Sequence, residues 1–171
     1  MLDFLTVTRP PEGVEIFIRI LIAMLMGALI GIEREYKNRP AGMRTHTLVC
    51  LGAATIALLE SLIRLNILNS GTSEGLTLNI GRMSAQVISG IGFLGAGTIF
   101  MAQKKIAGLT TAASLWMTCC LGLVIGFGYY GIAIVDGIIV IVVLTLLQRI
   151  LHVNALKRVE IQFIHRAETI S

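Results

Sequence analysis

The sequence has little of what a soluble domain relies on. Only 14% of its 171 residues are charged, against about 25% in typical soluble domains. Three cysteines (Cys50 and the adjacent Cys119 and Cys120) lie in apolar runs without CxxC spacing, which excludes a disulfide scaffold and favours buried thiols over metal or redox chemistry. What is abundant is apolar: 55% of the residues are hydrophobic and the mean hydropathy is +0.83. A soluble fold of this length could not hide so much apolar surface, so the composition indicates a membrane protein.

Apolar runs divide the chain into segments close to the roughly 20 residues that a spanning helix needs. These segments cover residues 14–33, 46–65, 82–101, 110–128 and 130–151. We therefore expect an all-α membrane protein, a bundle of five transmembrane helices. Its expected parts are an N-terminal periplasmic segment (1–13), a five-span hydrophobic module (14–151) and a short cytoplasmic tail (152–171). Within the tail, residues 158–164 alternate with a period of two, which favours a β-strand.

Lysine and arginine are divided unequally between the two sides of this expected bundle. The loop at 33–45 holds four, the loop at 102–109 two and the chain from Arg149 onward four, which gives ten on one side. The other side has only four: Arg9, Arg19, Arg64 and Arg82. By the positive-inside rule this predicts the N-terminus outside and the C-terminus in the cytoplasm. Topology therefore accounts for the net charge of +4, and we expect no nucleic-acid partner.

Glycines recur at helix-packing spacings within the apolar segments. Gly90, Gly92, Gly95 and Gly97 include a formal GxGxxG, but a dinucleotide fingerprint needs a preceding strand and a soluble βαβ unit. Close packing of membrane helices explains them better, as it does the GxxxG pairs Gly27–Gly31 and Gly122–Gly126. The alternative is a kinked third span that exposes carbonyl groups to an ion.

Ionisable and polar residues inside the spans form a second group of candidates, because a charge in lipid is costly unless it is paired or hydrated. Glu60 and Arg64 are four residues apart and can pair on one helix face, and Asp136 could meet Arg82. Three acids (Glu15, Glu60 and Asp136) and three arginines (Arg19, Arg64 and Arg82) balance, so we expect a network of ion pairs that holds the helices together. An ion or proton path, with Asp136 as the uncompensated acid, is the alternative. The expected network comprises Arg19, Glu60, Arg64, Arg82, Gln86 and Asp136.

The cytoplasmic loops carry most of the remaining polar residues, and they suit either a solvated interface facing anionic headgroups or a docking surface for a partner. The three histidines have no obvious Ser or Cys partner and no phosphate loop is present, so we expect no enzyme, no cofactor and no metal site. The candidate docking residues are Glu33, Arg34, Glu35, Arg39, Gly42, Arg44, Thr45, His46, Thr110 and Thr111.

At these residues the chain resembles the MgtC/SapB family of bacterial inner-membrane proteins. The resemblance is carried by "GALIGIEREYKNRPAGMRTHTLV" from Gly27, "RMSAQVISGIGFLGAGTI" from Arg82 and "GLTTAASLW" from Gly108. It implies five spans in the plasma membrane and a role in adaptation to low magnesium and in intracellular survival of pathogens (virulence). It further implies that MgtC-like members restrain the membrane sector of the F-type ATP synthase. Full MgtC proteins continue into a cytoplasmic α/β domain, so we expect this chain to be a short or truncated form.

Two functions from different classes are therefore open. The first is a non-enzymatic membrane regulator whose partners are the lipid bilayer and a membrane protein such as the F-type ATP synthase, with a homo-oligomer also open. The second is a transporter or channel for a cation, Mg²⁺ or a proton, supported by Asp136 and the glycine-rich third span. A lipid-binding or scaffolding role is a third interpretation of the basic loops.

Overall fold

A computed structural model describes residues 11–69, 81–102 and 105–146. Helix α1 covers Gly13–Tyr36, α2 Met43–Asn69, α3 Arg82–Gly97 and α4 Leu109–Gly126, and strands β1 (Phe100–Ala102) and β2 (Lys105–Ala107) join α3 to α4. A further helix, Tyr130–Leu146, follows and is called the last helix below. The described residues thus confirm a helical protein. The β-strand expected at 158–164 lies outside them, as does the expected cytoplasmic tail.

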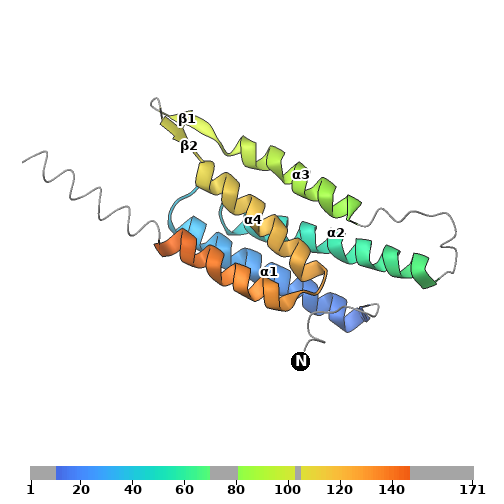
Figure 1. Cartoon of the computed structure of the whole chain (residues 1–171). Coiled ribbons are helices and arrows are strands. Elements are labelled where there is room, and N and C mark those ends of the chain that lie inside the picture. Colours follow the sequence, from blue (N-terminus) through green and yellow to red (C-terminus); the bar gives the residue numbers. More distant parts are fainter. Residues whose placement is uncertain (1–10, 70–80, 103–104, 147–171) are drawn as a thin grey trace, which may run out of the picture.

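Successive helices run antiparallel, so their ends gather at two poles of the bundle (Figure 1). At one pole, called the hairpin end, α1 and α3 finish and α2 and α4 begin, beside the two strands. At the opposite pole, called the far end, α1 begins, α2 finishes and α3 begins. The described helix ends therefore lie at one of two levels.

Helices α1, α2 and α4 approach one another closely at glycines. A Cβ atom on Gly27 would lie 2.8 Å from the carbonyl oxygen of His46, and one on Gly122 would lie 2.9 Å from the Cβ of Ala53. Gly31 and Gly126 face the backbone of α2 at similarly close range. Missing side chains let backbones approach in this way, so these four glycines make the interhelical contacts expected of them. Around the contacts lies an apolar core: Ala23, Ile30, Cys50, Ala54, Leu121, Ile125, Ala133, Val140 and Leu144.

Within the described ranges, three helices are long and apolar enough to cross a membrane: Gly13–Tyr36, Met43–Ile67 and Leu109–Gly126. The last helix is a shorter apolar helix, and α3, with 16 residues, is only about 24 Å long against a hydrocarbon core of about 30 Å. The membrane assignment is therefore supported by three helices. The five-span count and the orientation of the termini stay predictions.

The third apolar segment ends earlier than the sequence predicts. We expected a span at 82–101 and a loop at 102–109, whereas α3 ends at Gly97 and a hairpin pairs Met101 with Ile106. The Thr98 hydroxyl, directly after the helix, donates to the carbonyl of Gly95 (2.8 Å) and so competes with continuation of the helix. Gly108, with a left-handed φ of +89°, allows the end of the hairpin to return against the backbone of Thr98, where a side chain would strike.

Candidate functional site

A buried polar cluster lies at the hairpin end, around Arg34. The Arg34 side chain is 0% exposed, and its Nε lies 3.5 Å from Oε2 of Glu33. None of its three guanidinium nitrogens has a hydrogen-bond partner among the described residues. Glu33 is shared with Lys37, whose Nζ lies 2.5 Å from Oε1, and Lys37 also donates to the carbonyl of Leu144 on the last helix (2.9 Å). The end of α1 thus buries a charge that is paired but not hydrogen-bonded, an expensive arrangement in an apolar interior.

His46 connects α2 to α4 within the same cluster. Its Nδ1 lies 3.0 Å from the carbonyl of Gly42, which can only accept a hydrogen bond. In a neutral ring the proton is therefore on Nδ1. Its Nε2 lies 3.1 Å from the hydroxyl of Ser114. The Ser114 hydroxyl also lies 2.9 Å from the carbonyl of Thr111, so beside a neutral His46 it can serve only one of the two acceptors fully. The cluster therefore contains one hydroxyl with two alternative acceptors.

The candidate docking residues separate into an interior and a surface set. Arg34, His46 and Thr111 are buried, so the interpretation of this stretch as a wholly solvated loop is corrected. Glu35 accepts the N–H of Met43 (2.9 Å) and thereby caps the start of α2, beside Gly42. The exposed members of the set are Glu35, Arg39, Arg44, Thr45 and Thr110.

At the far end the expected ion-pair network is built from different pairs. Arg19, also 0% exposed, pairs with Glu15 (2.5 Å) and donates to the carbonyl of Gly126 at the end of α4 (2.7 Å). Glu60 accepts the N–H of Gly81 (2.6 Å) and both the N–H (3.1 Å) and the hydroxyl (2.5 Å) of Ser84. It therefore joins α2 to the start of α3. Among the ion pairs of the described residues, none joins Glu60 to Arg64.

The remaining members of the expected network are not brought together. Arg82 and Gln86 are exposed on α3, and Asp136 is half-buried on the last helix. No ion pair between Arg82 and Asp136 occurs in the part of the chain that the structure describes. The same part holds no group of three or more His, Cys, Asp or Glu placed to bind a metal ion.

Helix α3 lies at the edge of the bundle, and its glycines differ from those of the core. A Cβ atom on Gly90, Gly92 or Gly97 would meet no atom within 4 Å, and one on Gly95 would make only ordinary contact with Ala112 (3.5 Å). Close packing at these positions is therefore not found within the described chain. The physical reason is that only one stripe of α3, through Ser84, Ile91 and Gly95, is buried.

Sequence reasoning missed several polar residues that the structure places in these clusters. Lys37 is spaced to pair with the candidate Glu33 along α1, and Ser114 and Thr118 follow the candidate Thr111 on one stripe of α4, so helical spacing could have found these three residues. No local signal joins Ser84 to Glu60, because 24 residues separate them.

These features define a polytopic helical membrane protein with ionisable side chains buried between its helices. A sequence model of the MgtC family matches residues 20–153, and the chain belongs to that family. The match begins within α1 and includes α2, α3, α4 and the last helix.

Curated relatives support the same membership. The chain is 42% identical over 139 residues to "Protein MgtC" of Brucella abortus (strain 2308), which covers 80% of this chain and 54% of that protein. It is 42% identical over 124 residues to "Protein MgtC" of Salmonella typhimurium (strain LT2), covering 72% and 48%. It is 36% identical over 130 residues to "Putative magnesium transporter YhiD" of Escherichia coli (strain K12), covering 76% and 59%.

The chain thus spans about half the length of the curated relatives it matches. None of these names is that of an enzyme, and one of them refers to magnesium. No solved structure matches the chain.

Proposed function

We propose that this chain is a non-enzymatic regulator in the bacterial inner membrane that acts by binding another membrane complex. The partner that the family resemblance implies is the membrane sector of the F-type ATP synthase, restrained during growth in low magnesium and intracellular survival. The observation that carries the proposal is the outward face of α3, which is open and built largely of small residues.

Helices that face lipid in this bundle carry large side chains on their outer surfaces. On α1 the exposed residues include Val14, Phe17, Ile18, Leu21, Leu25, Leu29 and Ile32. On the last helix they include Ile132, Val135, Ile138, Ile139, Val142, Val143 and Leu146. Such side chains are ordinary where a helix contacts acyl chains.

The outward face of α3 has a different composition, although Ile88, Phe93 and Leu94 interrupt it. Small residues are favoured where two membrane helices pack together, because they allow the backbones to approach. Small residues on an exposed helix face therefore favour contact with a helix of a partner over contact with lipid. The exposed small residues of this face are Ala85, Ser89, Gly90, Gly92, Ala96 and Gly97.

A cation transporter is the second candidate, and Asp136 is the observation that favours it. This carboxylate is half-buried on an apolar helix and makes no ion pair within the described residues. Intramembrane acids frequently mark ion or proton paths. The name of the Escherichia coli relative refers to magnesium transport as well.

Proton pumping in inverted membrane vesicles distinguishes the two functions. The vesicles, with and without this protein, are energised first by ATP and then by respiration. A regulator of the ATP synthase lowers only ATP-driven pumping, whereas a protein that moves ions collapses both gradients. Loss of both gradients, abolished by Asp136→Asn, would replace the regulator proposal with the transporter.

Matched glycine variants test the role of the α3 face. Gly92→Leu places a large side chain on that face, and Gly52→Leu places the same side chain in open space on α2. We expect Gly92→Leu to restore ATP-driven pumping and Gly52→Leu to leave the inhibition intact. Equal inhibition by both variants would exclude the α3 face as the docking surface.

A further inference from the structure

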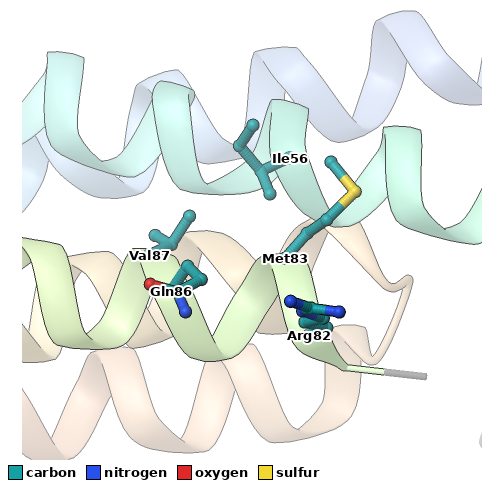
Figure 2. A pocket seen from close by; sticks show the side chains of 5 residues that line it. All are labelled: Ile56, Arg82, Met83, Gln86 and Val87. Carbon is teal, nitrogen blue, oxygen red and sulfur yellow. The ribbon is translucent and has the colours of Figure 1, made fainter. Parts of the chain in front are cut away.

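A groove runs between α2 and α3 near the far end of the bundle, on the side of α3 that faces α2. It has a volume of about 460 Å³ and is lined by Ile56 of α2 and by Arg82, Met83, Gln86 and Val87 of α3. Figure 2 shows Ile56 facing Met83 and Val87, with the polar ends of Arg82 and Gln86 on the near side of α3. The volume lies within the range of small-molecule sites, roughly 300–1,000 Å³.

The lining combines an apolar floor with two polar groups at one side. Ile56, Met83 and Val87 offer only apolar side chains. Arg82 and Gln86, one helical turn apart, offer a guanidinium and an amide, both of which donate hydrogen bonds. A ligand that matches this lining has an apolar chain and an anionic, oxygen-rich group attached to it.

Glu60, which binds residues at the start of α3, forms no ion pair with Arg82 among the described residues. Both carboxylate oxygens of Glu60 are bound to Gly81 and Ser84, and Glu60 is only 8% exposed. Glu60 thus accepts the N–H of Ser84 in the first turn of α3, whereas the guanidinium of Arg82 is exposed and in no ion pair with a described acid. The charged group that this groove offers to an anion is therefore the side chain of Arg82.

The depth of Arg82 suits a lipid headgroup. Glu60, which bonds to the neighbouring Gly81, lies 17 residues along α2 from Met43, or about 25 Å. In a hydrocarbon core about 30 Å thick, a long arginine side chain at this depth reaches the headgroup level. In a bilayer, moreover, an apolar groove between α2 and α3 that is open to the outside of the bundle contacts lipid acyl chains.

We propose that this groove binds one anionic phospholipid, with an acyl chain against Ile56, Met83 and Val87 and the phosphate on Arg82 and Gln86. Guanidinium groups bind phosphate oxygens with two parallel hydrogen bonds, which accounts for an arginine at this position. The site uses side chains of α3 other than the small residues of its outward face, and it does not depend on the ATP synthase being the partner.

Native mass spectrometry of the whole purified chain, released from detergent, tests the proposal. Phosphatidylglycerol and phosphatidylcholine with identical acyl chains are titrated separately, and inorganic phosphate is titrated alone. We expect one tightly bound phosphatidylglycerol, about tenfold weaker binding of phosphatidylcholine, and no binding of phosphate alone. Arg82→Gln should weaken phosphatidylglycerol binding about tenfold, because hydrogen bonds to charged groups are lost.

Two matched pairs separate the groove from the general surface. Arg64→Gln removes an arginine at the same end of the bundle that does not line the groove, and should leave binding unchanged. Ile56→Trp fills the groove and should release the lipid, while Leu59→Trp, one turn away and exposed, should not.

Three results would overturn the proposal. Equal binding of the two lipids would show that no phosphate recognition exists, and binding of inorganic phosphate with the same affinity would identify a free anion as the ligand. Equal losses from Arg82→Gln and Arg64→Gln would show only a general attraction of anions to the basic far end.

Discussion

Glycines recur both in the α1–α2–α4 core and on α3, but the two groups have opposite surroundings. In the core, Gly122 and Gly126 lie against the backbone of α2, so that a Cβ atom has no room. On α3, Gly90 and Gly97 face open space. A small residue in a membrane helix can therefore serve contacts inside its own chain or stay available for another molecule. Only the arrangement of the helices distinguishes the two.

The arginines of the two regions differ in the same way. Arg19 is fully buried in the core and is bound at both ends of its guanidinium, to Glu15 and to the carbonyl of Gly126. Arg82 is exposed at the edge and lines a groove. Arg19 thus connects α1 to the end of α4 inside the core, whereas the guanidinium of Arg82 is exposed on α3. Substitutions at these positions should separate stability from binding.

The largest effect is expected from Gly122→Leu. Its side chain would strike the carbonyl of Cys50 and the Cβ of Ala53, which lies 2.9 Å from the position of a Cβ on Gly122. Overpacking typically costs about 1–3 kcal/mol, and here the neighbour is backbone that cannot move aside, so we expect the upper end of that range or loss of folding. Unfolding by dodecyl sulfate titration in mild detergent measures it. Wild-type stability in this variant would contradict the close approach of α2 and α4.

A smaller loss is expected for Arg19→Gln. Breaking a buried ion pair costs roughly 3–5 kcal/mol, but Glu15 is 32% exposed, so water compensates part of the loss and we expect about 2 kcal/mol. The same titration should place Arg82→Gln within about 0.5 kcal/mol of wild type, as for other surface changes. If the two variants lost equal stability, the difference between core and edge would not hold for charges.

Glu60 connects α2, in the core, to the start of α3, at the edge, and Glu60→Gln tests this connection. The amide keeps the shape but replaces a charged acceptor of three hydrogen bonds, so we expect a loss of about 1–2 kcal/mol. Because Glu60 binds the start of α3, the amides of Gly81 and Ser84 should exchange with deuterium faster than in wild type. Amides of α1 and α4 should be unchanged, and faster exchange throughout the bundle would show that α3 is not a separate edge.

The sequence predicts the helices well and the partners of their polar residues poorly. Apolar runs at 14–33 and 110–128 agree with α1 and α4, because hydropathy reports what a segment contacts on average. The spacing of Glu60 and Arg64 predicts a local pair, yet Glu60 binds α3, since backbone N–H groups at a helix start compete for the same oxygens. Arg34 stands in a charged stretch that looks solvated, but its position on α1 turns it inward. Both outcomes depend on the rotation of one helix against another, which local spacing does not contain.

The smallest effect, and the sharpest comparison, comes from adding one methyl group to each region. A Cβ atom on Gly92 would meet no atom of the described residues within 4 Å, and alanine avoids the entropy cost of a glycine in a helix. Gly92→Ala should therefore stabilise the isolated chain by about 0.5–1 kcal/mol. Gly126→Ala carries the same propensity gain, but its Cβ would lie 2.7 Å from that of Ala57 and closer still to the carbonyl of Ala54, so its net effect should be destabilising. Opposite signs in the same dodecyl sulfate titration would establish that one residue type fills two roles. If Gly92→Ala also destabilised the purified chain, α3 would already be packed against something in detergent, and a change in its mass by light scattering would identify a second copy as the partner.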